Sequence, residues 1–357
     1  MQPSFIKRAE SFAAEIGAKY PILLGPMAGA CPVSLSVAVA KGGGMGACGA
    51  LLMQPEAIKQ WAADFRAKTD GPFQLNLWIP DETPERNLNH EAELRDFLRE
   101  WGPEVSANSA NDTPPDFEAQ CEALLEISPL AISSIMGVFN ERFVERMKAK
   151  NIKWFANVTT VGEAKKAEAA GADIIVAKSF EAGGHSGAFR PEEAMRQGVG
   201  LLSLVPAIAD AVALPIIATG GVADGRTAAA ALMLGASAVQ IGTGFLRAHE
   251  STIASAWSDA IGNAQPEDTL VTRAFSGRAG RSIATQYALA MEHANSPEPA
   301  PYPVQRGLTQ AMRAAAAKEN RIDSMQAWAG QSARMAQTKS ATQITQEIWQ
   351  SAKDFYS

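Results

Sequence analysis

Cysteine and histidine are scarce in this chain, and their scarcity excludes several classes of protein. The 357 residues include three cysteines (Cys31, Cys48 and Cys121) and four histidines, and no CxxC motif or metal-ligand spacing joins them. An odd number of widely spaced cysteines argues against a disulfide framework and is typical of a reducing compartment. We therefore predict neutral thiols, no disulfide-rich fold and no metal site.

Long apolar runs and basic clusters are also missing. No uninterrupted apolar run reaches the roughly 20 residues of a membrane-spanning helix. The first residues, MQPSFIKRAESFAAEIG, carry Lys, Arg and Glu within their apolar stretch, which argues against a secretory signal. The formal net charge is −6, without a Lys/Arg-rich run, which disfavours nucleic acids and anionic membranes as partners. We expect a soluble, cytoplasmic protein, monomeric or homodimeric, that acts on a small molecule.

What the chain does contain is an alternation of short apolar segments with helical patterns. Several of the apolar segments, such as IIVA, IIAT and AVQI, are apolar throughout, which is typical of strands covered on both faces in a parallel sheet. Between them, apolar residues recur at helical spacing, and helices are predicted at 140–150, 161–170, 206–212, 226–234 and after Pro55. The predicted strands are 22–25, 45–48, 73–77, 131–134, 153–157, 174–178, 216–219 and 238–241.

Eight strands with helical connections predict an α/β fold, a (β/α)8 TIM barrel. An open doubly wound sheet is the competing architecture, because it alternates in the same way. The count of eight and the glycine turns after the last two strands favour the barrel. The expected organisation is a barrel over 1–245 with an insertion at about 80–128, a small, mainly helical lid at 246–314, and C-terminal helices at 315–357 that return to the barrel.

The strongest chemical signal is a pair of glycine-bearing turns after consecutive strands, Gly220-Gly221 and Gly242-Thr243. Such turns let backbone N–H groups approach an anion, and the helix that follows adds its positive end. The Thr243 hydroxyl can donate another hydrogen bond. Because parallel barrels gather their active sites at the carboxyl ends of the strands, we predict a phosphate site here.

Three further positions end predicted strands. His185 lies in AGGHSG, where flanking glycines let a planar ligand approach, and it is the candidate acid–base residue. The segment Gly25-Pro26-Met27 can line a ring system, although simple packing is the alternative interpretation. Asn76 can bind the polar edge of a ligand or, equally well, cap a loop.

Taken in order, these segments resemble the nitronate monooxygenases, formerly called 2-nitropropane dioxygenases. The segments that carry the resemblance are PILLGPMAG, GPFQLNL, GADIIVAKSFEAGGHSGAF, IIATGGVADGRTAAAALMLGASAVQIGTGFL, SGRAGRS and WAGQ, and they extend over most of the chain. The resemblance implies a barrel with non-covalently bound FMN that oxidises alkyl nitronates with O2 to carbonyl compounds and nitrite.

The resemblance also assigns roles to residues. His185 is expected to be catalytic, and Tyr302 and Arg306 are expected to contact the substrate. The residues expected to bind FMN are Pro26, Met27, Asn76, Lys178, Gly183, Gly184, Gly220, Gly221, Gln240, Gly242, Thr243 and Gln331.

Four positions depart from the family pattern. Lys178 replaces a usual glutamine, Ile135 replaces a histidine, and Arg306 and Gln310 stand where a tyrosine and a lysine are common. Two alternative functions therefore remain, an NAD(P)H-dependent FMN reductase acting on quinones or enoyl thioesters, and a non-redox barrel that binds a phosphate ligand.

Overall fold

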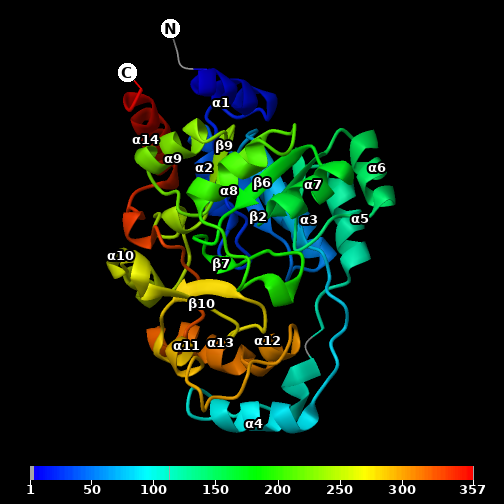
Figure 1. The fold of residues 1–357 in the computed structure, drawn as a ribbon, viewed down its shortest axis with the longest axis vertical. Coiled ribbons are helices and arrows are strands. Elements are labelled where there is room, and N and C mark those ends of the chain that lie inside the picture. Colours follow the sequence, from blue (N-terminus) through cyan, green and yellow to red (C-terminus); the bar gives the residue numbers. More distant parts are fainter. Residues whose placement is uncertain (1–3, 112, 357) are drawn as a thin grey trace.

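The computed structural model describes residues 4–111 and 113–356, and shows a parallel barrel with a smaller layer over one end (Figure 1). Eight strands follow one another in the order β1-β9-β8-β6-β5-β4-β3-β2. Hydrogen bonds of Met45 join β2 to β1, since its N–H donates to the Ile22 carbonyl at 3.0 Å and its carbonyl accepts from the Leu24 N–H at 2.9 Å. The strands are β1 (Ile22–Leu24), β2 (Gly46–Gly49), β3 (Phe73–Trp78), β4 (Ala131–Ile135), β5 (Lys153–Val158), β6 (Ile174–Lys178), β8 (Ile216–Thr219) and β9 (Ala238–Ile241).

The predicted barrel is confirmed, and the open doubly wound sheet is excluded. Each predicted strand overlaps an observed one, with ends that differ by at most one residue. The segments that are apolar throughout belong to β6, β8 and β9. Side chains on one face of these strands pack against the surrounding helices, and those on the other face pack inside the barrel. Burial of both strand faces explains why these sequences do not alternate.

A ring of helices surrounds the strands. In α3, the side chains of Ile58, Trp61, Ala62 and Phe65 are buried at the helical spacing seen in the sequence, and Pro55 stands in the first turn. The ring consists of α2 (Val33–Lys41), α3 (Pro55–Arg66), α5 (Phe117–Ile127), α6 (Glu141–Ala149), α7 (Val161–Ala169), α8 (Leu201–Ala209), α9 (Gly225–Met233) and α14 (Ala341–Asp354).

Helix α8 corrects one prediction. A helix was expected over 206–212, yet α8 extends from Leu201 to Ala209 and has Pro206 in its interior. The backbone N–H of Leu201 donates to Glu181 Oε1 at 2.9 Å. The start of the helix is therefore stabilised by a residue from the preceding loop, which a local pattern does not reveal.

The amino-terminal end of the barrel is closed by α1 (Ser4–Glu15), which lies across it (Figure 1). Phe12 and Ile16 pack inside the barrel against Leu23, Phe155 and Val176. Nearby, α14 packs against α9 and α2. The carboxyl ends of the strands therefore face the opposite side, toward the second layer.

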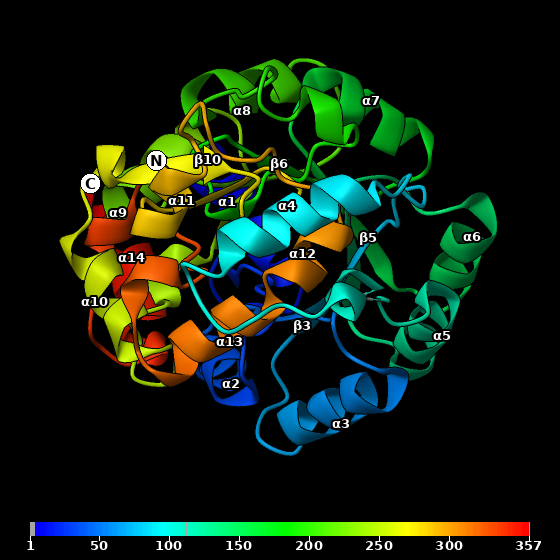
Figure 2. The same ribbon diagram turned by 90° about the horizontal axis from the view of Figure 1, so that it is seen from below.

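That second layer, the lid, crosses the carboxyl end of the barrel (Figure 2). Its helices α4, α12 and α13 share a separate core that includes Leu94, Phe275, Tyr287, Leu308 and Met312. Of the residues 80–128 interpreted as an insertion, α4 contributes to this layer, whereas α5 packs between α3 and α6. The lid helices are α4 (Leu88–Leu98), α10 (Ser255–Asn263), α11 (Gln286–Ala290), α12 (Val304–Leu308) and α13 (Gln310–Lys318).

The lid also contains a three-stranded antiparallel sheet that the sequence analysis did not predict. Its order is β10 (Thr269–Thr272), β11 (Gly280–Ile283) and β7 (Gly184–His185). Strand β7 comes from the loop after β6, so the loop that carries His185 is part of the lid sheet. His185 pairs with Gly280, and Gly184 pairs with Arg281.

Burial controls the chemistry of the cysteines. All three are free and buried, and desolvation raises the pKa of Cys31 and of Cys121 to about 12. These thiols are therefore neutral. Within 4–111 and 113–356, no helix is both long and apolar enough to cross a bilayer.

Candidate active site

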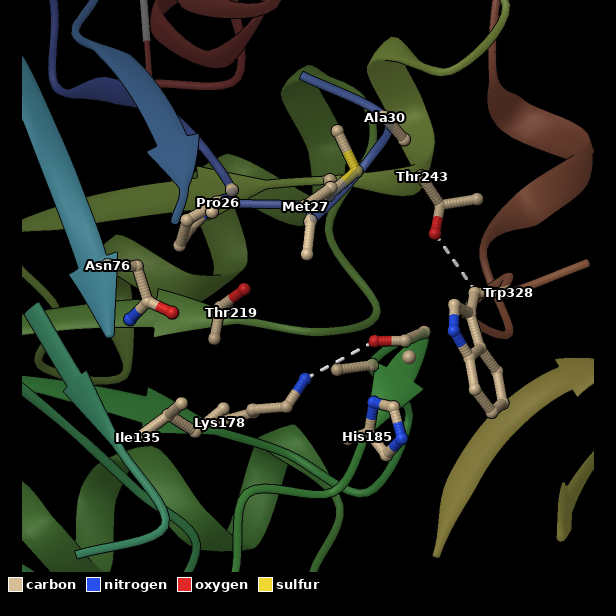
Figure 3. Close-up of a pocket in the computed structure, with 18 of the residues that line it drawn as sticks. Pro26, Met27, Ala30, Asn76, Ile135, Lys178, His185, Thr219, Thr243 and Trp328 are labelled. Atoms are coloured by element: carbon tan, nitrogen blue, oxygen red, sulfur yellow. Dashed lines mark hydrogen bonds between the residues drawn. The ribbon is translucent and has the colours of Figure 1, made fainter. Parts of the chain in front are cut away.

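A pocket lies between the carboxyl ends of the barrel strands and the lid (Figure 3). Most of the residues singled out in the sequence meet here, although they come from segments far apart in the chain. Gln331 is the exception, because only its neighbours Gly330 and Ser332 line the pocket. The predicted residues that do line it are Pro26, Met27, Asn76, Lys178, Gly183, Gly184, His185, Gly220, Gly221, Gln240, Gly242, Thr243, Tyr302 and Arg306.

The two glycine turns form one wall. Gly220 and Gly221 have φ angles of +95° and +74°, which side chains other than glycine rarely adopt. Within the described residues, neither of their N–H groups donates a hydrogen bond to the protein. Thr219 Oγ1 donates a hydrogen bond of 2.8 Å to the Gln240 carbonyl. This bond joins the first turn to β9, the strand that leads into the second turn. These turns therefore present free backbone donors suited to an anion.

Thr243 links the second turn to the C-terminal part of the chain. Its Oγ1 accepts a hydrogen bond from the Gly330 N–H at 3.0 Å, so its own hydroxyl proton remains available to a ligand. Next to it, the Gln331 N–H donates to the Glu181 carbonyl at 2.9 Å. Gly330 and Gln331 thus support the pocket through their backbone, and Gln331 is not among the residues that line it.

The turn after β1 forms the adjacent wall, because β1 pairs with β9, and it is held by a buried thiol. Cys31 Sγ donates to the Gly25 carbonyl and accepts from the Met27 N–H, both at 3.3 Å. A Cβ atom on Gly25 would lie 3.2 Å from the backbone of Gly242, so the first and last strand ends approach each other closely. This role of Cys31 in holding the turn was not predicted from the sequence. The one local signal for it was the spacing of four residues between Met27 and Cys31.

His185 lies at the junction of barrel and lid. Its Nε2 is 2.7 Å from Ser276 Oγ. The rings of Trp78 and Trp328 flank the imidazole, with centroids at 4.6 and 4.9 Å. Burial, followed by the charges of Arg278 and three other cations, lowers the pKa of His185 to about 3. The ring is therefore a neutral hydrogen-bonding group at physiological pH.

Lys178 is the cation on the barrel side of the pocket. It ends β6, and its Nζ donates to the Gly183 carbonyl over a long 3.4 Å (Figure 3). Burial lowers its pKa to about 8, because desolvation disfavours the ammonium form. Ile135, at the end of β4, lies nearby as an apolar part of the lining.

Two arginines approach from the lid. Arg306 of α12 lines the pocket as expected, but Gln310 is exposed and does not. Arg313, one helical turn further along α13, lines it instead, and donates to the Arg306 carbonyl at 2.8 Å and to Gln326 Oε1 at 3.1 Å. The sequence analysis missed Arg313 because it did not predict where α13 begins.

The pocket is positively charged although the whole chain is acidic. Its charged lining residues are Lys178, Arg306 and Arg313, and no carboxylate lines it in the part of the chain that the structure describes. Arg278, which is 5% exposed, lies close by but forms an ion pair with Asp81 at 2.9 Å. Such a field attracts small anions.

Aromatic and polar lining residues were also missed. Trp78 follows Asn76 by two positions in β3, so strand periodicity could have placed both on one side. Ser276 and Trp328 lie in the SGRAGRS and WAGQ segments, whose individual side chains had no predicted role. Asn76 itself donates to Ser133 Oγ at 2.9 Å, which fixes the orientation of its amide.

Comparison with known proteins agrees with this arrangement. Residues 10–351 match the family model described as nitronate monooxygenase. A probable nitronate monooxygenase of Staphylococcus saprophyticus is 31% identical, over 95% of this chain and 96% of the relative. One from Staphylococcus aureus is 34% identical, over 92% and 93%.

Solved structures show the same similarity. The nitroalkane oxidase from Streptomyces ansochromogenes superposes with a TM-score of 0.88 at 31% identity, covering 96% of this chain and 98% of the other. FabK from Thermotoga maritima superposes with a TM-score of 0.75 at 28% identity, covering 97% and 96%.

Proposed function

Because the chain belongs to the nitronate monooxygenase family of oxidoreductases, we propose that it binds FMN in this pocket and oxidises a small alkyl nitronate with O2 to a carbonyl compound and nitrite. The observation that carries the proposal is the combination of two donor-rich glycine turns with the cations that line the pocket around His185. None of the described residues that line it carries a carboxylate. The turns suit a phosphate, and the cations suit a small organic anion.

The residues present fit FMN. Gly220 and Gly221 offer N–H donors, and Thr243 offers a hydroxyl. A Cβ on Gly183 would lie 2.6 Å from the Gly330 nitrogen, so only glycine lets the loop after β6 pack against the WAGQ backbone beside these donors, which together form the FMN cradle. The turns suit one terminal phosphate, and no GxGxxG turn for a dinucleotide follows an early strand. The bound flavin supplies the electron-transfer chemistry, and the protein supplies position and charge.

The lid supports the proposed binding of a nitronate. Arg306 and Arg313 line the pocket from two helices, and the planar fork of an arginine matches the two oxygens over which a nitronate spreads its charge. Trp78, Trp328 and Tyr302 surround the same space and limit the access of water. Charge and aromatic enclosure together favour a small organic anion.

His185 is proposed to orient the substrate through a hydrogen bond. Ser276 Oγ accepts from the Arg278 N–H at 3.3 Å, and its own proton can go to the Arg278 carbonyl at 3.3 Å or to His185 Nε2 at 2.7 Å. The shorter contact favours donation to Nε2, which leaves the imidazole proton on Nδ1. Because the ring is neutral, His185 acts through a positioned hydrogen bond and not through a fixed charge.

A second candidate function, already open from the sequence, is an NAD(P)H-dependent FMN reductase of quinones or enoyl thioesters. Anaerobic stopped-flow measurements of flavin bleaching separate the two. We expect ethyl or propyl nitronate to bleach the bound flavin faster than equal concentrations of NADH or NADPH. Rapid bleaching by a nicotinamide and none by a nitronate would establish the reductase instead.

A further inference from the structure

Lys178 lines the pocket, and it has no ion pair among the residues that the structure describes. Arg278, which lies close by, is by contrast paired with Asp81. The one hydrogen bond of Lys178, to the Gly183 carbonyl, is 3.4 Å long. An ammonium group has three donors, so at least two of them remain for a ligand.

A charge in this position destabilises the free protein. Transfer of an ammonium group from water into a buried site is costly unless an opposite charge meets it, and the lowered pKa of Lys178, about 8, reflects that cost. The same charge contributes to lowering the pKa of His185, so Lys178 acts on the side of the pocket where the proposed reaction occurs. The glycine turn after β8 is close as well, because β8 pairs with β6 and Lys178 is opposite Thr219, so measurement has to separate an effect on the ring from an effect on the phosphate.

We propose that Lys178 stabilises the negative charge that FMN acquires on reduction, and thereby raises the midpoint potential of the bound cofactor. Two electrons and one proton convert the neutral flavin ring into a reduced ring with one negative charge. The Lys178 ammonium stabilises that charge. The inference rests on the proposed binding of FMN, but it is independent of which substrate donates the electrons.

The test compares Lys178→Gln, which removes the charge, with Lys178→Arg, which retains it. Arg313→Gln is the matched control, because it removes a lid cation from the same pocket. The midpoint potential of the FMN-loaded proteins is measured at pH 7 against a reference dye with a chemical reductant, and the Kd of oxidised FMN is measured by fluorescence. Lys178→Met serves as a second neutral variant if Lys178→Gln does not fold.

We expect the neutral variants at position 178 to lower the ratio of reduced to oxidised FMN, at a fixed potential, by about tenfold to hundredfold. For a two-electron couple this is a shift of about −30 to −60 mV. Lys178→Arg should stay close to the wild type, and Arg313→Gln should shift the potential less than Lys178→Gln does.

Three results would overturn the inference. An unchanged potential in the neutral variants would show that Lys178 does not act on the ring, and an unchanged potential with a weaker Kd for oxidised FMN would assign it to the phosphate. An equal shift in Arg313→Gln would show a general field instead of a specific residue. A wild-type protein that takes up no FMN would refute the proposed function itself, which distinguishes the two failures.

Discussion

The imidazole of His185 and the hydroxyl of Ser276 meet at 2.7 Å across the boundary between barrel and lid. His185 belongs to the loop after β6, and Ser276 belongs to the lid segment between β10 and β11. Because Trp78 and Trp328 enclose the ring as well, its orientation is determined by both layers at once. The predictions below test this junction and the cradle beside it.

Replacement of His185 by Asn should lower turnover of a nitronate by about 10² or more while FMN remains bound, since the loss of one positioned hydrogen-bonding group costs on this scale. Steady-state nitrite release and the flavin absorbance of the purified variant measure the two effects. His249→Asn, at an exposed position outside the pocket lining, is the matched control. Wild-type turnover in the His185 variant would remove this residue from the mechanism.

The pH dependence of kcat/KM should reflect Lys178 and not His185. The pKa of Lys178 is about 8, so its ammonium is present below that pH and is lost as the pH rises through it. With an anionic substrate, kcat/KM should therefore fall above about pH 8. The pKa of His185 is about 3, so no ionisation near pH 6.5 is expected from it. In Lys178→Arg the fall should disappear from this range, because a guanidinium stays protonated; a fall that persists unchanged would contradict the assignment.

The ion pair of Arg278 and Asp81 should stabilise the attachment of the lid. Arg278 is 5% exposed and Asp81 25% exposed, so Asp81→Ala leaves a largely buried cation without its partner. We expect the free energy of unfolding to fall by about 2 kcal/mol, less than for a fully buried pair because Asp81 retains some solvent contact. Urea unfolding measures it. Glu122→Ala, which breaks an exposed pair with Arg146, should lower the free energy of unfolding much less. Equal losses in the two variants would contradict the prediction.

Gly183→Ala should weaken FMN binding by at least about tenfold, equivalent to about 1.4 kcal/mol. The added Cβ would lie 2.6 Å from the Gly330 nitrogen and 2.7 Å from the Ala329 carbonyl carbon, so the WAGQ backbone must move and the Gly330–Thr243 hydrogen bond must lengthen. Gly162→Ala in α7 is the control, since its nearest neighbour would be Thr160 Oγ1 at 3.9 Å. Titration with FMN gives both Kd values, and equal values would show that the cradle tolerates a side chain.

The barrel could be predicted from the sequence because its signals are local. Burial of both faces makes β6, β8 and β9 apolar throughout, and the helices α3, α6, α7 and α9 each follow a strand and were predicted close to their observed bounds. The position of the pocket residues followed from one rule, that active sites gather at the carboxyl ends of barrel strands.

What the sequence did not reveal depends on contacts between distant residues. The pairing of β7 with β11 joins His185 to Gly280, and the strands are too short and too rich in glycine and arginine to show a strand pattern. The start of α8 depends on Glu181, and the inward position of Arg313 depends on the register of α13. No local motif encodes any of these three relationships.

Because β7 belongs to the lid sheet, the position of His185 depends on the position of the lid. Because Gly184 and His185 are hydrogen-bonded at the edge of that sheet, a lid that lifted as one body would pull the histidine away from the barrel. In such an open form, the His185 imidazole would be displaced from the barrel residues of the pocket, and solvent would enter the cavity. Displacement of such a lid and loss of the His185 arrangement would therefore occur together.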